Sequence, residues 1–285
     1  MPIAEGWQRF FPADLVARWK PRTFALPSGA QTQLVSLGEG PPIIAVPPII
    51  GWKETFLRQA PFFARRRRFI TFDLREPARG TPLRWDGLLD DITAVADAEA
   101  PEPFVLLGHS LGGAAALSWT LAHPHRVRAL VLSSTFARVH FHPSVWWNRF
   151  GAQGVALAAS ALPQEASLAV ARAMARANLW VYDRHCDETM LEFIRWAVRH
   201  SDARTLRRRV RLALGVDLRA RLAEVRVPSL VLWGGAEPPY TRRAGEDLAR
   251  GIAGASHAVV PGANHLAPLT NPRAFNEIVE AWLDR

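Results

Sequence analysis

The chain has 285 residues, and 49% of them are hydrophobic, so it can bury one large core or a core with an insertion. Its formal charge of +9 raises the question of a nucleic-acid partner, but the basic residues are nearly all arginines scattered along the chain. The short basic runs at 65–68 and 207–209 are typical of solvated helix faces, and no recognition motif accompanies them. We therefore expect no nucleic-acid partner.

The sequence also disfavours a protein built on cysteines and one that spans a membrane. Cys186 is the only cysteine, which excludes an intrachain disulfide and a cysteine-rich metal site. No apolar run approaches the roughly 20 residues that a membrane span needs. Residues 1–15 lack the basic start and apolar stretch of a signal peptide, so we expect a soluble, cytoplasmic chain.

The predicted elements begin with an amphipathic helix. Trp7, Phe10, Phe11, Leu15 and Trp19 follow helical spacing. The simpler interpretation is that this helix packs on its own domain. A contact with a partner or a membrane surface is the alternative, but the polar face is not basic.

Strand-like runs then recur along the chain. The runs at 22–26 and 32–37 flank Pro-Ser-Gly-Ala and predict a β-hairpin. Six runs that are apolar throughout follow, at 43–46, 69–72, 104–107, 127–132, 229–233 and 257–260. Such runs are typical of strands buried on both faces. Helical patterns at 85–98, 112–122, 242–251 and 272–283 lie among or after them, so the sequence predicts an α/β fold with a mostly parallel central sheet of about eight strands, flanked by helices.

One long interval has no convincing strand. From 136 to 223 the chain shows Ala-, Leu- and Arg-rich helical patterns instead, and this length is too great for a simple crossover. We predict a helical cap subdomain at 136–223, inserted into a core domain formed by 1–135 and 224–285.

The richest motif is G-x-S-x-G at 108–112, which directly follows a predicted buried strand and precedes a predicted helix. This context places Ser110 on a sharp turn at the sheet edge, where the N-terminus of the helix faces any developing negative charge. The alternative is a glycine-rich turn with a buried serine. The register of strand, motif and helix favours a nucleophile.

A serine nucleophile needs a base, and the base needs an acid to orient it. Of nine histidines, His265 lies after the last predicted strand and before the last predicted helix, at the same sheet edge as Ser110. Glu237 follows the strand at 229–233, whereas the loop after 127–132 contains no carboxylate. A surface histidine and a solvated glutamate are the alternatives for these two residues.

Four stretches, GHSLGG, VPSLVLWGGAE, PGANHLAPLTNP and FITFDLREPARG, resemble the α/β-hydrolase fold superfamily, in the branch with a helical cap after the sixth strand. The resemblance covers the chain from about Arg22 onward. It implies that Ser110 is the nucleophile, Glu237 the acid and His265 the base. It also implies that the backbone N–H of Leu111 is one donor of the oxyanion hole.

The sequence departs from that family at two places. The usual His-Gly after the third strand is replaced by Pro47 and Pro48, and because proline has no N–H, the second oxyanion donor falls to Ile49 or Ile50, of which we favour Ile49. Glutamate also stands where the family more often has aspartate.

The predicted reaction is acyl transfer from a small-to-medium apolar carboxylic ester through an acyl-enzyme. The aromatic start of the cap suggests that Trp146 and Trp147 contact the substrate, together with His109 beside the nucleophile. We expect no cofactor and no metal. A lactone or thioester substrate, an acyltransferase on the same triad, and a non-catalytic or partner-dependent member of the fold remain as alternatives.

Overall fold

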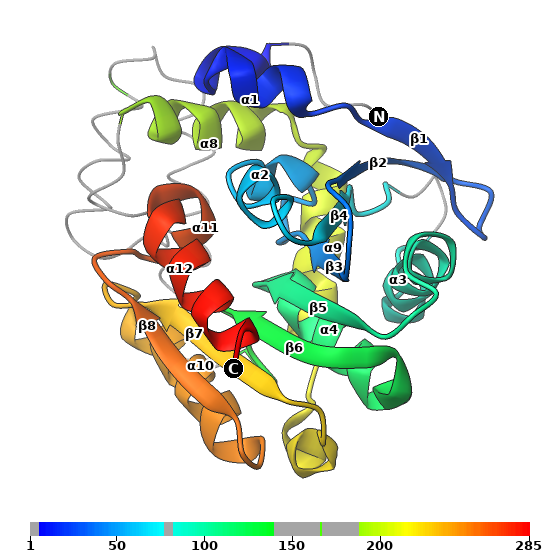
Figure 1. The fold of residues 1–285 in the computed structure, drawn as a ribbon, viewed down its shortest axis with the longest axis vertical. Coiled ribbons are helices and arrows are strands. Elements are labelled where there is room, and N and C mark those ends of the chain that lie inside the picture. The colour runs from blue at the N-terminus through cyan, green and yellow to red at the C-terminus, as the bar shows by residue number, and fades with distance from the viewer. Residues whose placement is uncertain (1–5, 77–81, 140–165, 167–187) are drawn as a thin grey trace.

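A computed structural model describes residues 6–76, 82–139, 166 and 188–285 of the chain. Eight strands form a single sheet in the order β1-β2-β4-β3-β5-β6-β7-β8 (Figure 1). Their bounds are β1 Arg22–Ala25, β2 Gln31–Leu37, β3 Pro42–Val46, β4 Arg68–Phe72, β5 Phe104–His109, β6 Val127–Ser133, β7 Ser229–Gly234 and β8 Ser256–Val260.

The sheet is parallel from β4 through β8, whereas β2 pairs antiparallel with both β1 and β4. The pair β1–β2 is the predicted hairpin, with Ala25 opposite Gln31. The prediction of a mostly parallel sheet of about eight strands is confirmed. Because β3 and β5 to β8 run in one direction, the loops that follow them gather at one edge of the sheet.

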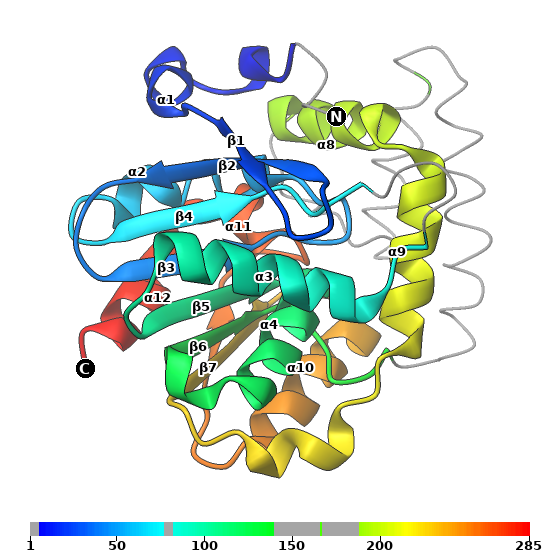
Figure 2. The same ribbon diagram turned by 90° about the vertical axis from the view of Figure 1, so that its right-hand side faces the viewer.

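Alternate residues of the strands build two cores, one on each face. In β3, Ile44 and Val46 pack on one face with Leu117, whereas Ile43 and Ala45 pack on the other with Phe275. Helices therefore cover both faces (Figure 2). On the first face they are α3 (Trp85–Glu99), α4 (Leu111–Ala122) and α10 (Pro239–Gly251); on the second, α2 (Ala60–Phe63), α11 (Ala267–Thr270) and α12 (Pro272–Leu283).

The interval between β6 and β7 is helical in its described part. It contains α8 (Glu188–His200), α9 (Ala203–Gly215) and the short 3-10 helix η5 (Arg219–Glu224), which confirms a helical insertion after the sixth strand. Figure 2 shows α9 at the end of the sheet toward which β4 points. The boundaries 136–223 stay a prediction. No helix in the described ranges has the length and hydropathy needed to cross a membrane.

The N-terminal segment differs from the single helix that its spacing predicts. It forms a 3-10 helix η1 (Trp7–Phe10) and a short α1 (Ala13–Arg18), with Phe11 between them in an extended conformation at φ −131° and ψ 153°. Phe11 is extended because the residue before a proline, here Pro12, is disfavoured in the helical region. Its ring lies 4.8 Å from that of Phe193 in α8, so the segment packs on the insertion of its own chain.

This packing predicts that Phe11→Ala lowers the free energy of unfolding by about 3 kcal/mol, since it removes a buried ring that contacts both Trp7 and Phe193. Urea denaturation measures the change. The exposed neighbour Gln8 is the control, and Gln8→Ala should stay within about 0.5 kcal/mol of the parent. Equal stability of the two variants would mean that the aromatic segment does not support the fold.

Candidate active site

Ser110 lies on a strained turn between β5 and α4. Its backbone has φ 54° and ψ −120°, in a region that residues other than glycine rarely adopt. Two hydrogen bonds connect the turn to the end of β6 and to the loop after it. The Ser110 N–H donates to the carbonyl oxygen of Ser133 at 2.9 Å, and the Ser110 carbonyl accepts from the hydroxyl of Thr135 at 2.6 Å.

The glycines around Ser110 are explained by close backbone approach. A Cβ atom at Gly108 would clash with the carbonyl oxygen of Gly112, and one at Gly112 would clash with that of Val46. A Cβ at Gly113 would lie 2.5 Å from the Cβ of Thr135. The first turn of α4 can therefore pack this closely against β3, β5 and the loop after β6 only if these positions lack side chains.

His265 comes from the loop between β8 and α11. Its Nε2 atom lies 3.0 Å from the Oγ atom of Ser110. Its backbone N–H donates to the side-chain oxygen of Asn264 at 2.7 Å. The loop lies tightly against the end of β7, where a Cβ at Gly234 would clash with the carbonyl oxygen of Asn264. The predicted nucleophile and base are thus brought within hydrogen-bond distance.

Glu237 lies beyond His265, just after β7. Its Oε2 atom is 3.8 Å from Nδ1 of His265, and neither atom has a hydrogen-bond partner among the described residues. The other carboxylate oxygen accepts from the backbone N–H of Gly234 at 3.2 Å. The carboxylate and the imidazole face each other at slightly more than hydrogen-bond distance, and such contacts often tighten when substrate binds.

The charge state of Glu237 follows from two opposed effects. Burial raises the pKa of the carboxyl, whereas the interaction with His265 and nearby hydroxyl groups lowers it by more, so the pKa of Glu237 lies below the usual value for glutamate. Glu237 is therefore ionised at neutral pH. The side chain that faces Nδ1 of His265 therefore carries a buried negative charge.

His109 is fully buried beneath His265. Its Nδ1 atom lies 3.1 Å from the Ser133 hydroxyl, and its ring centroid lies 5.4 Å from that of His265. Burial and the neighbouring His265 lower the pKa of His109 to about 3, so the ring is neutral at physiological pH. Its role in substrate binding stays a prediction.

The two backbone groups predicted for the oxyanion hole lie on adjoining segments. Leu111 is the first residue of α4, where an N–H group has no acceptor within the helix. Ile49 lies in a turn after β3 that is closed by a hydrogen bond from the Gly51 N–H to the Pro48 carbonyl at 2.7 Å. The start of this turn packs on the first turn of α4, and the roles of Leu111 and Ile49 stay predictions.

The structure describes only some of the aromatic residues of the predicted cap. Trp146 and Trp147 lie outside the described residues. Trp196, which belongs to the same insertion, is buried in α8, and its ring lies 5.3 Å from that of Trp52 in the core domain. The Trp196 ring therefore packs between the insertion and the core.

One residue near the site was missed by the sequence analysis. The run 207–209 was expected to be a solvated face, but the side chain of Arg209 is only 2% exposed, and the expectation is wrong for this residue. Its guanidinium donates to main-chain carbonyls of the Ile49–Ile50 turn. Thr205, Arg209 and Ala213 lie at a spacing of four and are all buried, so Arg209 belongs to the inner face of α9.

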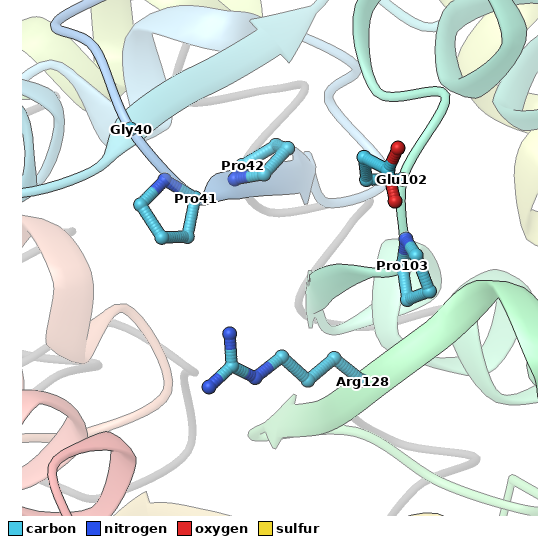
Figure 3. Close-up of a pocket in the computed structure, with 6 residues that line it drawn as sticks. All are labelled: Gly40, Pro41, Pro42, Glu102, Pro103 and Arg128. Carbon is cyan, nitrogen blue, oxygen red and sulfur yellow. The ribbon is translucent and has the colours of Figure 1, made fainter.

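Away from this arrangement, the described residues hold no candidate metal site, and a pocket lies at the opposite edge of the sheet. No three His, Cys, Asp or Glu side chains are grouped there as a metal would require. A pocket of about 510 Å³ opens at the opposite edge of the sheet, where β3, β5 and β6 begin (Figure 3). It is lined by Gly40, Pro41, Pro42, Glu102, Pro103 and Arg128.

A match to a known protein family agrees with the observed fold. A family model described as alpha/beta hydrolase fold matches residues 41–272, which is most of the chain. The chain belongs to the α/β-hydrolase fold family. The resemblance seen in the sequence is thereby confirmed.

Individual relatives are distant. A 2-hydroxy-6-oxononadienedioate/2-hydroxy-6-oxononatrienedioate hydrolase of Pseudomonas putida is 26% identical over 270 residues, which cover 90% of this chain and 89% of that protein. A pimeloyl-(acyl-carrier protein) methyl ester esterase of Pectobacterium carotovorum is 26% identical over 232 residues, covering 81% and 88%. These names support the prediction of a carboxylic ester hydrolase of the α/β-hydrolase type.

Solved structures show the same fold. The enol-lactonase from Burkholderia xenovorans matches with a TM-score of 0.74 at 22% identity, over 93% of this chain and 100% of that chain. At this identity the likeness concerns the fold alone.

The close approach at the nucleophile turn predicts that Gly108→Ala destabilises the protein by about 3 kcal/mol, because the new methyl group meets rigid backbone. Thermal and urea unfolding measure the loss. Gly215 ends α9 with open space around its Cβ position, so Gly215→Ala is the control and should shift stability by less than about 1 kcal/mol. A Gly108→Ala variant as stable as the control would show that the turn tolerates a side chain.

Proposed function

We propose that this protein hydrolyses a small-to-medium apolar carboxylic ester through an acyl-enzyme formed on Ser110. The observation that carries the proposal is the 3.0 Å separation of Ser110 Oγ and His265 Nε2, with the serine on a strained turn at the start of α4. A serine hydroxyl is a weak nucleophile unless an adjacent base removes its proton, and this geometry supplies the base.

In the proposed reaction, His265 accepts the Ser110 proton while Oγ attacks the ester carbonyl. The tetrahedral intermediate places its negative oxygen against the N–H groups of Leu111 and Ile49, at the positive end of α4. His265 then gives the proton to the leaving alcohol. Water repeats the sequence on the acyl-enzyme and releases the acid, so the proton returns and Ser110 is regenerated.

Glu237 completes the proposed triad. The carboxylate is buried and lies 3.8 Å from Nδ1 of His265, where it can orient the ring and stabilise the imidazolium that forms when Nε2 takes the proton. Gly234 holds one carboxylate oxygen through its N–H, which fixes the direction in which the other oxygen points.

The substrate class rests on the relatives and on the insertion. One relative is named as a methyl ester esterase, which supports a carboxylic ester as the substrate. The aromatic composition of the cap, predicted at 136–223 and including Trp146 and Trp147, favours an apolar acyl or alcohol group. Because its side chain is fully buried, His109 would act by supporting the ring of His265 from within the core.

Removal of the nucleophile is the first test. Ser110→Ala should lower the turnover of p-nitrophenyl esters by at least about 10³-fold, because the remaining site can bind substrate but cannot form the acyl-enzyme. Ser118→Ala on the same helix removes a hydroxyl that accepts from the Trp85 ring, and it should keep the parent's turnover. Appreciable turnover by folded Ser110→Ala protein would reject the assignment.

The acid is tested separately. Glu237→Gln should lower kcat by roughly 10²–10³-fold with little change in KM, because the lost charge matters most once His265 carries the proton. Glu237→Asp should retain partial activity. Glu246→Gln, at a half-buried surface position on α10, is the control and should match the parent. Near-parental kcat for Glu237→Gln would place the acid elsewhere.

A further inference from the structure

The buried guanidinium of Arg209 joins two loops at the active-site edge. Arg209 lies on α9 of the insertion, and its Nη1 atom donates to the carbonyl oxygens of Ile49 at 3.2 Å and Ile50 at 2.8 Å. Its Nη2 atom donates to the carbonyls of Leu74 at 2.7 Å and Arg75 at 3.1 Å. One side chain of the insertion thus holds both the turn after β3 and the segment after β4.

The partners of this cation are unusual for a buried charge. Buried arginines are normally neutralised by carboxylates, yet the hydrogen-bond partners of Arg209 among the described residues are all main-chain carbonyls. Burial lowers the pKa of Arg209 to about 10, so the group is still protonated at neutral pH. The carboxylates of Asp73, Glu76 and Asp202 act on this charge electrostatically, whereas its hydrogen bonds go to peptide carbonyls, two of them in the Ile49–Ile50 turn.

The peptide groups that Arg209 binds are connected to both candidate oxyanion donors, the N–H groups of Ile49 and Ile50. In a trans peptide the N–H points away from the carbonyl oxygen, so a bond from Arg209 to the Ile49 carbonyl orients the N–H of Ile50 in the opposite direction. Arg209 also binds the carbonyl of the Ile50–Gly51 peptide, and the Gly51 N–H of that peptide donates to the Pro48 carbonyl. The Pro48 carbonyl belongs to the Pro48–Ile49 peptide, whose N–H is that of Ile49.

Each candidate N–H therefore ends a chain of peptide groups that starts at Arg209. Hydrogen bonds in such chains polarise one another, so a cation at the first carbonyl makes the last N–H a stronger donor. The chain to Ile50 passes through one peptide group, and the chain to Ile49 passes through two.

Gly51 gives an independent observation. It has φ +82°, and a Cβ atom at this position would clash with the guanidinium of Arg209. A glycine here thus leaves the space that the arginine fills. The turn also begins with Pro47 and Pro48, whose fixed φ angles leave little freedom for the preceding backbone.

We propose that Arg209 is a positioning residue for the oxyanion hole, which orients and polarises the N–H groups of the Ile49–Ile50 turn from the insertion. This inference rests on the proposed function, because an oxyanion hole matters only if Ser110 forms a tetrahedral intermediate. It also means that the hole is complete only while α9 is docked on the core.

The test uses Arg209→Met, Arg209→Lys and the control Arg207→Met, an exposed arginine of the same helix. Three quantities are measured on folded protein: the rate constant for labelling Ser110 with a fluorophosphonate, kcat and KM for p-nitrophenyl esters, and the inhibition constant of a trifluoromethyl ketone. The ketone forms a tetrahedral adduct that needs the oxyanion hole, whereas KM for ester reports ground-state binding.

Arg209→Met should lower the labelling rate and kcat by roughly 10–10²-fold, because oxyanion donors remain but lose their orientation and polarisation. Ketone binding should weaken in parallel, with KM nearly unchanged. Arg209→Lys keeps the charge but not the planar fork, and it should give an intermediate loss. Arg207→Met should behave as the parent.

The outcomes separate this inference from the proposed function. A parent enzyme that is not labelled at Ser110 overturns both. A labelled parent with Arg209→Met labelled at the same rate overturns the inference alone, as does a loss confined to KM. If Arg209→Met does not fold, Arg209→Lys decides, and parental labelling and ketone binding in that variant would reject the role of Arg209.

Discussion

The site depends on one constraint, the close packing of the first turn of α4 against the backbone of β3 and β5. Gly108 and Gly112 allow main chain to touch main chain, and Gly113 allows the helix to meet Thr135. This contact leaves Ser110 in its strained conformation, with its backbone bonded to Ser133 and Thr135. Strain of this kind persists only where the surrounding structure holds it, and here the surrounding structure is the centre of the sheet.

The remaining residues reach Ser110 because the parallel strands end at a common edge. β8 leads to His265, β7 to Glu237 and β3 to the Ile49 turn, so residues far apart in sequence meet without any long side chain. The insertion adds to this edge from outside, because Arg209 of α9 binds the carbonyls of the turn after β3. Core strands thus lead to the residues that we propose react, and the insertion binds the backbone beside them.

The sequence was informative where local pattern and topology coincide. Continuous apolar runs identified the strands, and the positions of Ser110, Glu237 and His265 after three of them predicted a shared edge. The N-terminal helix was mispredicted because periodicity ignores the restriction that Pro12 places on Phe11. Arg209 was missed because a run of arginines indicates solvent exposure on average, whereas its partners are main-chain carbonyls that no sequence pattern displays. The burial of His109 likewise depends on how the loop of His265 folds over it.

The central claim is that Ser110 carries the acyl group during turnover. In the most direct measurement, the protein is mixed with p-nitrophenyl pivalate, whose hindered acyl group leaves slowly. The reaction is then quenched with acid, and the modified peptide is mapped by mass spectrometry. We expect one pivaloyl group, located on Ser110 and absent from Ser110→Ala protein. An acyl group on any other residue, formed at the rate at which p-nitrophenolate is released, would contradict it.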